Sequence, residues 1–472
     1  MIPSKKTIYE FLTEYAQLSP DEAVLFNEEI SYSAKELKFT VENLANTLFG
    51  QGIKAGDFVA IPAERNIYTV IKFFAVQILG AVAVMIDVHE NPLKALEKNK
   101  VEVKLILTDV PKRYARQEEL LFSPIRDSSK STIVIFTSGS TGTNKAVLIS
   151  QYAFINNSYD TRDIGDYRRH DISMAVLPFH HVFALAQIIT ALVTQHSIFI
   201  PSGTETEAFL SAIEKYRVTR MNGVPSLYLS MVKIAEKYDI ASLRCGLIGG
   251  APLSVKEFCE IEARLGMNLI PVYGMSECIG ISCADYRDPV QRRANSVGKI
   301  YSMNKLKIVD DDGRELSPGV SGEIHVKSPA FMNGYLDETE DVTDGDGFFA
   351  TGDLGYLDEE GYLHINGRKK DIIIRNGNNL STAIIEGKIK SLPFVIDAAV
   401  VGIHDEAVGE LPAAAIVTAE GTEIDEIFVK LREVLSKQEM PARIVRLKEI
   451  PLTSSGKADK QKIKTMFIKK CV

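Results

Sequence analysis

The 472-residue sequence has no tryptophan, few cysteines and no long run of apolar residues. Its most apolar stretches, residues 73–88 and 184–201, are interrupted by glutamine, glycine or histidine, so neither supplies the roughly 20 apolar residues of a membrane span. Residues 1–6 lack the apolar core of a signal peptide. A net charge of −8 without a long basic run argues against a nucleic-acid partner. These absences predict a cytoplasmic globular protein with no membrane span.

The cysteines give no sign of a disulfide framework or a zinc site. Their number is odd, and the sequence has neither paired C-x-x-C motifs nor histidine partners at metal-binding spacing. We therefore expect reduced thiols that pack as small apolar side chains. They are Cys245, Cys259, Cys278, Cys283 and Cys471.

Helix-spaced apolar patterns alternate with short strand-like runs through the first half of the chain, which predicts parallel sheets covered by helices. Helices are expected at residues 7–18, 33–51, 68–79, 152–158 and 204–216. Strands are expected at residues 58–61, 82–87, 105–108, 172–177 and 220–224. The fold class is therefore α/β, with stacked sheets in a large N-terminal domain.

The pattern changes after residue 296. Short β runs at Lys305–Val309 and Gly322–Lys327 are separated by turn sequences, which predicts a small β-barrel-like subdomain at about 296–366. The polar segment 367–371 has the composition of a domain boundary. We predict an N-terminal domain at 1–368 and a smaller C-terminal α/β domain at 369–472. In the latter, strands are expected at 398–403, 413–419 and 443–447 and a helix at 425–437.

A loop of small, hydroxyl-bearing and glycine residues follows the apolar run 133–136. It comprises Thr137, Ser138, Gly139, Ser140, Thr141, Gly142, Thr143, Asn144 and Lys145. Glycines allow close backbone approach, hydroxyls donate hydrogen bonds and Lys145 adds positive charge, so the loop suits a polyphosphate. It is not a Walker loop, because Lys145 is followed by a strand-like run and not by a helix. Such a loop alone is more often a surface loop, so its meaning depends on the rest of the sequence.

Seven short stretches in a fixed order resemble the adenylate-forming (AMP-binding) superfamily. They are TSGSTGTNKAV at 137–147, PFHHVFAL at 178–185, GGAPLS at 249–254, YGMSE at 273–277, TGDLGY at 351–356, GRKKDIIIRNG at 367–377 and PLTSSGKADK at 451–460. That superfamily includes acyl- and aryl-CoA synthetases, beetle luciferases and the adenylation domains of peptide synthetases. The resemblance implies a large nucleotide-binding domain and a small, mobile C-terminal lid. It also implies an enzyme in which a carboxylate attacks the α-phosphorus of ATP, pyrophosphate leaves, and a thiol takes the acyl group.

The resemblance implies three nucleotide-binding segments. The phosphate loop is the 137–145 segment, and the adenine-side loop comprises Gly249, Gly250, Ala251 and Pro252. In the YGMSE stretch, Tyr273 is expected to stack on or beside the adenine, next to Gly274. Ser276 is expected to reach the α-phosphate, and Glu277 to hold Mg²⁺ with a hard oxygen ligand.

Five further residues take roles by the same resemblance. Asp353 is expected to accept hydrogen bonds from both ribose hydroxyls, with Arg368 beside it. Lys370 is expected at the hinge of the lid. Lys457 is expected to bridge the substrate carboxylate and the α-phosphate as a protonated counter-charge. His181 is expected to border the acyl pocket and to shift between the half-reactions.

The predicted substrate is a small carboxylic acid with an apolar body, either fatty or aromatic. Amino-acid-activating relatives carry an aspartate where this chain has Val182, which offers no counter-charge to an α-ammonium group. The predicted cofactors are ATP, Mg²⁺ and CoA, or the phosphopantetheine arm of an acyl carrier protein. A non-catalytic nucleotide-binding protein is the alternative from another class, and no feature favours a luciferase.

The chain departs from the family pattern at several positions. Asn144 and Ala146 replace residues that commonly flank the loop lysine, so the loop is expected to be less rigid. Thr382 and Ile384 replace a proline and a glutamate, which puts lid docking for thioester formation in doubt. Ile374 and Asn376 stand where several CoA ligases have lysines, so adenylation is predicted more firmly than the use of CoA.

Overall fold

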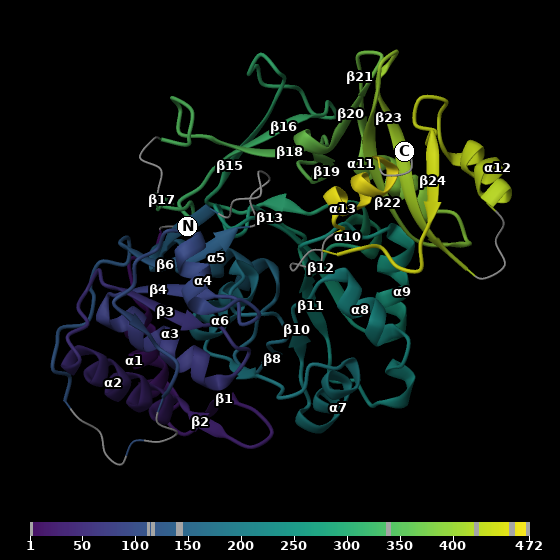
Figure 1. The fold of residues 1–472 in the computed structure, drawn as a ribbon. Helices are drawn as coiled ribbons and strands as arrows, with labels where there is room; N and C mark the ends of the chain where they lie inside the picture. The colour runs from purple at the N-terminus through teal and green to yellow at the C-terminus, as the bar shows by residue number, and fades with distance from the viewer. Residues whose placement is uncertain are drawn as a thin grey trace.

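The computed structural model describes residues 3–110, 114, 119–137, 145–336, 341–419, 424–452 and 458–468. Figure 1 shows a large N-terminal part in purple to teal, a smaller green β region above it, and a yellow-green C-terminal part at the upper right. The α/β fold class predicted from the sequence is confirmed.

A nine-stranded sheet forms one layer of the N-terminal part. Its order is β14-β13-β12-β11-β10-β8-β9-β1-β2, parallel from β12 to β1 and antiparallel at both ends. The strands are β1 Ala23–Phe26, β2 Ser31–Ser33, β8 Ile172–Met174, β9 Ser197–Phe199, β10 Arg220–Met221, β11 Cys245–Ile248, β12 Asn268–Tyr273, β13 Ser282–Cys283 and β14 Lys299–Ile300. The parallel strands all end at the same edge of the sheet.

A six-stranded sheet forms the second layer, in the order β17-β7-β6-β4-β3-β5. Its strands are β3 Phe58–Pro62, β4 Val82–Ile86, β5 Leu105–Ile106, β6 Ser131–Thr137, β7 Lys145–Ser150 and β17 Gly334–Tyr335. Strands β5, β3, β4 and β6 are parallel, whereas β7 runs antiparallel to both β6 and β17. The pairing of β7 with β17 joins residues that are far apart in the sequence.

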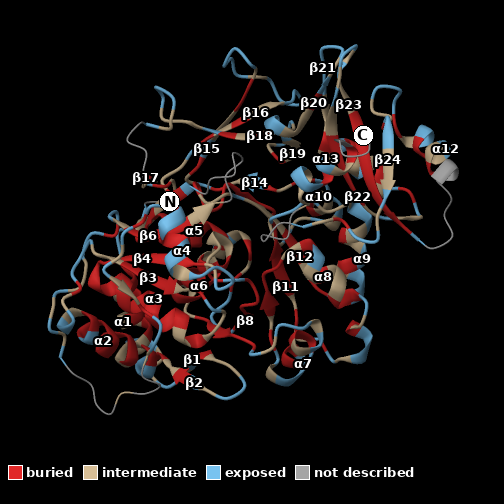
Figure 2. Ribbon diagram, in the orientation of Figure 1, coloured by how far each residue is buried: buried red, intermediate tan, exposed pale blue. Residues whose placement is uncertain are grey.

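Helices cover both sheets, and one large cluster of buried residues runs through the layers. Figure 2 shows that buried residues dominate the strands and the helices between them, such as α3. Capping boxes begin α1 at Thr7, α2 at Ser33 and α9 at Ser254. The helices are α1 Ile8–Leu18, α2 Ala34–Gly50, α3 Ile67–Leu79, α4 Pro92–Lys98, α5 Gln151–Ile164, α6 Val182–Thr194, α7 Thr206–Tyr216, α8 Pro225–Val232, α9 Val255–Leu265 and α10 Val290–Asn295, with a 3₁₀ turn η1 at Ala235–Lys237.

The green region is an open four-stranded antiparallel sheet, which corrects the predicted barrel-like subdomain. Its order is β15-β16-β18-β19, with β15 Lys305–Val309, β16 Gly322–Lys327, β18 Phe349–Leu357 and β19 Leu363–Arg368. Strands β15 and β19 are its edges, and no ladder joins them within the described residues. The turn residues predicted the strands, but closure depends on pairing between distant edges.

The C-terminal part begins with a 3₁₀ turn, η2 Lys369–Asp371, and forms a five-stranded sheet with helices. Its elements are β20 Ile372–Arg375, β21 Asn378–Ser381, α11 Thr382–Lys390, β22 Val395–Asp405, β23 Gly409–Thr418, α12 Ile424–Val434, β24 Arg443–Arg446 and α13 Lys460–Ile468. Two clusters of buried residues consist only of residues between 373 and 467. This separate core supports a boundary at 368/369, which stays a prediction.

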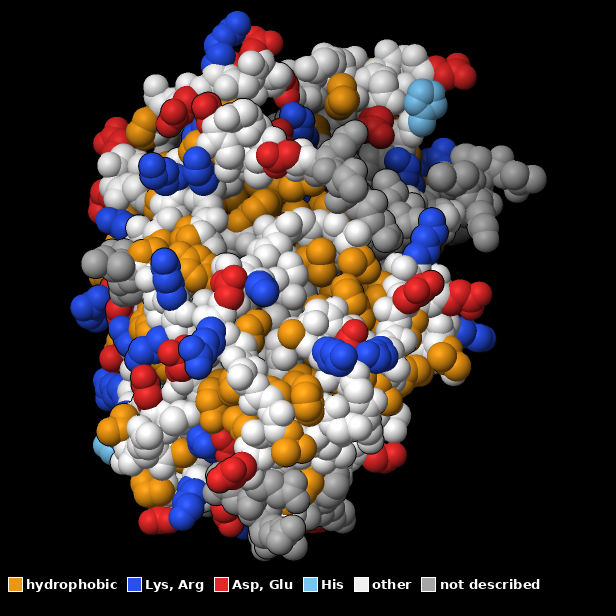
Figure 3. All heavy atoms as spheres, turned by 90° about the vertical axis from the view of Figure 1, so that its left-hand side faces the viewer, with side chains coloured by type: hydrophobic (Ala, Val, Ile, Leu, Met, Phe, Trp, Pro, Cys, Tyr) orange, Lys and Arg blue, Asp and Glu red, His pale blue; other side chains and the backbone are white. Residues whose placement is uncertain are grey.

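The surface shows no concentration of one charge on the face in Figure 3, where basic and acidic side chains are interspersed with small hydrophobic groups. Within the described residues, no helix combines the length and the apolar character needed to cross a membrane.

Candidate nucleotide-binding site

Several predicted site residues follow the carboxyl ends of neighbouring parallel strands. Gly249 directly follows β11, and Gly274 directly follows β12. The ends of β10, β11 and β12 meet at one edge, where α/β sheets commonly bind ligands.

Asp87, which follows β4 of the second sheet, has its Oδ2 3.7 Å from Nε2 of His180. Burial lowers the pKa of His180, although Asp87 opposes that shift. Carboxyl ends of strands from both sheets therefore lie near His180, in the stretch PFHHVFAL at 178–185.

Asp353 lies at the centre of one group of predicted residues. It is 5% exposed and is the cross-strand partner of Arg368 in the β18–β19 ladder. Arg368 Nε lies 2.9 Å from Asp353 Oδ1, and Tyr273 Oη donates to Asp353 Oδ2 at 2.7 Å. Tyr273 on β12 and Arg368 on β19 thus both contact the carboxylate of Asp353 on β18. Its role toward the ribose stays a prediction.

Tyr273 has a contact that the sequence did not predict. Burial, and then the negative charge of Asp353, raise the pKa of Tyr273 well above its ordinary value. The phenol therefore stays protonated at neutral pH and acts as a donor to the carboxylate. Stacking on adenine stays a prediction for the ring, and the hydroxyl has the separate task of holding Asp353.

A tight turn after β12 places Glu277. The Met275 N–H donates to the Ile279 carbonyl at 3.1 Å, and an added Cβ at Gly274 would lie 1.8 Å from that carbonyl oxygen. Ile279 has φ +50°, an unfavourable conformation for a β-branched residue. Ser276 is half-buried in this turn, and Glu277 is buried. The turn brings Tyr273 and Glu277 to the same edge.

Tyr335 is a site residue that the sequence reasoning missed. Its Oη donates to Glu277 Oε1 at 2.9 Å, and Lys145 Nζ lies 4.3 Å from its ring centroid. Tyr335 is 58 positions from Glu277 and reaches it because β17 pairs with β7. The only local signal is a Gly-Tyr pair in a turn-rich region.

The two loops expected to carry the phosphate and carboxylate contacts are only partly described. Thr137 and Lys145 are paired residues at the ends of β6 and β7. The predicted phosphate-loop residues Ser138, Gly139, Ser140, Thr141 and Gly142 lie outside the described residues, as does Lys457. On either side of residues 453–457, Leu452 and Ala458 form an antiparallel bridge. The ends of both segments are therefore fixed in the fold.

Lys460, at the start of α13, contacts η2 and α11 at the beginning of the C-terminal part. Its Nζ donates to Thr382 Oγ1 at 2.6 Å and lies 3.2 Å from Glu386 Oε1 and 3.7 Å from Asp371 Oδ2. Thr382, one of the departures from the family pattern, is thus a buried partner of a lysine. This contact gives Thr382 a structural role of its own in the C-terminal part.

The predicted hinge residue Lys370 lies in η2 and is exposed. Its neighbour Lys369 makes the ion pairs, with Glu323 Oε2 at 2.9 Å and Asp311 Oδ1 at 3.1 Å. These pairs hold the start of the C-terminal part against the four-stranded sheet. The hinge role of Lys370 stays a prediction.

The adenine-side loop borders apolar side chains. Gly249 is buried, and an added Cβ would lie 3.0 Å from Val272 Cγ1 and 3.8 Å from the Phe183 ring. At Gly250, which has φ +86°, an added Cβ would lie 3.4 Å from Val224 Cγ1. Ala251 and Pro252 continue this loop toward α9.

His181 is the N-cap residue of α6, two positions before Phe183. Its ring centroid is 4.1 Å from that of His180. The expected place of His181 at the border of the acyl pocket stays a prediction.

Glu277 is the described residue that fits a magnesium ligand. Within the described ranges no cluster of three or more His, Cys, Asp or Glu side chains could hold a metal ion by itself. A single buried carboxylate with hard oxygens fits a Mg²⁺ ion whose other ligands are phosphate oxygens and water. We therefore expect metal and nucleotide to bind together.

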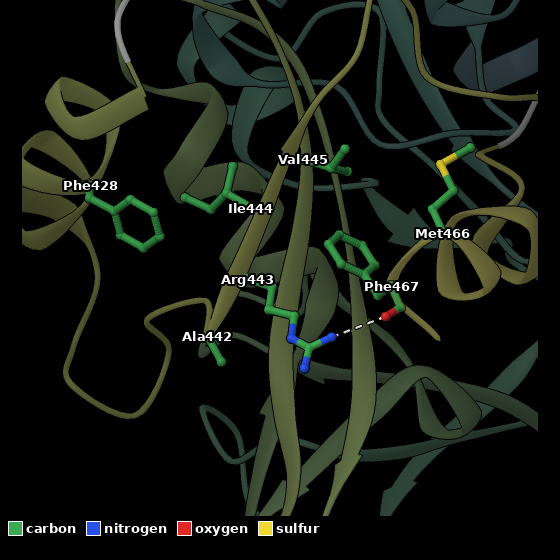
Figure 4. A pocket seen from close by; sticks show the side chains of 7 residues that line it. All are labelled: Phe428, Ala442, Arg443, Ile444, Val445, Met466 and Phe467. Atoms are coloured by element: carbon green, nitrogen blue, oxygen red, sulfur yellow. Dashed lines mark hydrogen bonds between the residues drawn. The ribbon is translucent and has the colours of Figure 1, made fainter. Parts of the chain in front are cut away.

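A hollow of about 280 Å³ lies elsewhere, in the C-terminal part (Figure 4). It is lined by Phe428, Ala442, Arg443, Ile444, Val445, Met466 and Phe467, none of which is a predicted site residue. Arg443 donates to the Phe467 carbonyl at 3.1 Å across it. Its lining is apolar apart from Arg443, so it lacks the convergent polar groups of a ligand site.

Two family models match the chain. The AMP-binding enzyme model matches residues 12–121 and 90–336, and the AMP-binding enzyme C-terminal domain model matches residues 385–457. The chain belongs to the AMP-binding enzyme family. The adenylate-forming family predicted from the seven stretches is thereby confirmed.

Two named relatives match this AMP-binding enzyme along its whole length. The chain is 28% identical to an indoleacetate–CoA ligase of Aromatoleum aromaticum, over 98% of each protein. It is 29% identical to a 2-succinylbenzoate–CoA ligase of Bacillus cereus, over 98% of this chain and 99% of that one. Both relatives are CoA ligases of aromatic acids by name.

Solved structures share the fold. The O-succinylbenzoate Coenzyme A synthetase of Bacillus subtilis, in complex with AMP, matches with a TM-score of 0.85 and 25% identity, over 98% of each chain. ATP-bound MatB of Rhodopseudomonas palustris matches with a TM-score of 0.89 and 24% identity, over 98% of each chain. The arrangement of a large N-terminal and a smaller C-terminal part is common to them.

Proposed function

We propose that this AMP-binding family member is an ATP-dependent acid–CoA ligase that activates an aromatic carboxylic acid through an acyl adenylate. The observation that carries the proposal is the turn after β12, which presents Tyr273 to Asp353 at one end and Glu277 to Tyr335 at the other. A carboxylate suited to a ribose, on β18, and a carboxylate suited to a metal, in the turn itself, thus lie at the two ends of one turn. This is the arrangement that adenylation of an acid requires.

The chemistry divides into two displacements. In the first, an oxygen of the substrate carboxylate attacks the α-phosphorus of ATP, and pyrophosphate leaves. In the second, a thiol releases its proton to solvent, its sulfur attacks the acyl carbon, the acyl–phosphate bond breaks, and AMP leaves with that electron pair. Mg²⁺ bound at Glu277 would offset phosphate charge. The residues of the chain mainly position the reactants, because phosphoryl transfer depends on geometry and charge stabilisation.

Individual residues have distinct tasks in this proposal. Asp353 orients the ribose while Tyr273 and Arg368 hold the carboxylate in place. Lys145 and the loop before it contribute positive charge and donors to the phosphates. Lys457 supplies a counter-charge to the attacking carboxylate and the α-phosphate.

The aromatic substrate class rests on the relatives and on the pocket. The two relatives are named for indoleacetate and 2-succinylbenzoate, which narrows the predicted choice between fatty and aromatic acids. Phe183 near Gly249 offers an aromatic ring, and Val272 and Val224 add apolar contacts around Gly249 and Gly250. Val182 offers no charge for an α-ammonium group.

The thiol acceptor is proposed to be CoA, by analogy with the named ligases. A carrier protein's phosphopantetheine arm presents the same thiol, so it is the acceptor to compare. A solved complex of the Bacillus subtilis synthetase with ATP and magnesium, at 25% identity and a TM-score of 0.84, supports the proposed ATP and Mg²⁺ requirement.

The test is pyrophosphate release with ATP and Mg²⁺ across aromatic, fatty and amino acids, with CoA, a carrier protein or no acceptor. We expect aromatic acids to give the fastest release and CoA to accelerate turnover. Lys457→Ala should reduce acid-dependent release by at least about 100-fold, as removal of a transition-state charge contact does. Lys462→Ala, at an exposed position near the start of α13, is the matched control.

Each other outcome would change the proposal in a defined way. Preference for a fatty acid would remove the aromatic substrate class. Acceleration by a carrier protein but not by CoA would change the acceptor. Release that is unaffected by Lys457→Ala would remove the proposed counter-charge.

A further inference from the structure

Tyr335 lies between two groups that the proposed function assigns to the metal and to the phosphates. Its hydroxyl donates to Glu277 Oε1 at 2.9 Å, and its ring faces Lys145 Nζ at 4.3 Å from the centroid. Tyr335 and Glu277 are both only 9% exposed. Burying a carboxylate is costly unless it is hydrogen-bonded, and Tyr335 provides such a hydrogen bond to Glu277.

The backbone around Tyr335 is attached to both groups as well. The Met332 N–H donates to the Glu277 carbonyl at 2.7 Å, so the segment before β17 holds the main chain of Glu277. The Leu336 N–H donates to the Ala146 carbonyl at 2.9 Å, which holds the residue after Lys145. Tyr335 therefore sits on a short strand fixed at both ends.

We propose that Tyr335 is a positioning residue that fixes the Glu277 carboxylate for Mg²⁺ and keeps it in register with Lys145 at the end of the phosphate loop. The inference rests on the proposed function, because it assumes that Glu277 binds the metal. Tyr335 is a neutral donor, so its hydrogen bond to Oε1 fixes the carboxylate without neutralising it. Outer-shell partners of metal-binding carboxylates act in this way.

The contact with Lys145 gives Tyr335 a second effect. A cation over the face of a tyrosine ring is attracted by it, and this attraction favours one position of Lys145 Nζ. A phenylalanine at this position would retain that attraction and the packing, and would lose only the hydroxyl. The substitution therefore separates metal positioning from phosphate-loop positioning.

The experiment measures the binding of α,β-methylene-ATP to the full-length protein by calorimetry, with excess Mg²⁺ and with EDTA. The ratio of the two dissociation constants reports how strongly metal and nucleotide bind together. We expect Tyr335→Phe to reduce this ratio about 10-fold, within the roughly 10–100-fold range of outer-shell changes at metal sites. In EDTA, the Tyr335→Phe variant should bind α,β-methylene-ATP with the same dissociation constant as the unmodified protein. Its melting temperature should also be the same. Mn²⁺ bound in the ternary complex, followed by electron paramagnetic resonance, provides a direct readout of the metal.

Tyr362→Phe is the matched control. Tyr362 is 8% exposed, and its hydroxyl donates to Asp288 Oδ1 at 3.1 Å, away from the proposed metal site. This variant loses the same kind of hydrogen bond and should keep the original ratio. Glu277→Gln removes the proposed metal-binding carboxylate, so it gives the lowest ratio of the two dissociation constants that loss of this ligand can produce.

Three outcomes would overturn the inference. An unchanged ratio in Tyr335→Phe would show that the hydroxyl does not position the metal ligand. Equal weakening with Mg²⁺ and with EDTA would show a purely structural role. If the unmodified protein shows no coupling between Mg²⁺ and nucleotide, the metal assignment of Glu277 fails, and both proposals fall with it.

Discussion

At the scale of single residues, the candidate site contains buried carboxylates that are each bound by specific donors. Asp353 is 5% exposed, and each of its two oxygens has one close partner, Tyr273 or Arg368. A buried carboxylate without such partners would be costly. Both partners are donors, and each carboxylate oxygen has a further lone pair with which it can accept a hydrogen bond from a hydroxyl group.

The first prediction concerns Asp353→Asn. The amide keeps the size of the side chain but loses its charge, so its hydrogen bonds to nucleotide hydroxyls should weaken. Hydrogen bonds to charged groups are worth about 1.5–3 kcal/mol, so AMP should bind roughly 10- to 100-fold more weakly in calorimetry. Asp312→Asn, which alters an exposed pair with Arg314, is the control. Equal AMP affinity in both variants would remove Asp353 from the nucleotide site.

At the scale of elements, the turn after β12 determines where Tyr273 and Glu277 lie. Gly274 is needed because the Ile279 carbonyl occupies the space of a Cβ. Ile279 in turn holds φ +50°, a conformation that the turn must stabilise by its other contacts. Sequence alone marked Gly274 as part of a motif, whereas the close approach to Ile279 becomes visible only in the fold.

We expect Gly274→Ala to displace the turn and Glu277 with it. A misplacement of about 1 Å in a catalytic arrangement can cost about 100-fold in rate, so kcat/KM for the acid should fall by at least that factor. Steady-state pyrophosphate release measures it. Gly345→Ala, where an added Cβ meets nothing within 4 Å, should leave the rate unchanged. A Gly274→Ala enzyme with normal kcat/KM would show that the turn can relax without cost.

Elements with a clear apolar period were predictable, and contacts between distant edges were not. The helix expected at 7–18 is α1 Ile8–Leu18, and the strand expected at Lys305–Val309 is β15 with the same bounds. The two-residue strand β17 is too short to carry a period, so its pairing with β7 and the Tyr335–Glu277 contact had no local signal. The predicted barrel-like subdomain was wrong for the same reason. A barrel closes only when the first and last strands of the sheet pair, and no local sequence pattern reports whether β15 and β19 do so.

At the scale of the whole molecule, burial makes stability depend on pH in the alkaline range. Burial raises the pKa of Cys278 and of Cys283 to about 12 each, from an ordinary value of 9.0. Both thiols lie in the interior of the N-terminal part. Between pH 9 and 12 they stay protonated in the folded protein, whereas they release protons when the chain unfolds.

The free energy of unfolding should therefore decrease as the pH rises above 9, because the unfolded chain binds fewer protons there. The stabilisation is fully present below pH 9 and is lost toward pH 12. Each thiol contributes up to about 1.4 kcal/mol per pH unit in this range. Urea unfolding of the unmodified protein and of Cys283→Ala at pH 8, 9 and 10 tests this. The variant should show the shallower decrease, and Cys259→Ala, at a half-buried position, is the control. Parallel slopes for all three proteins would show that the buried thiol does not couple folding to pH.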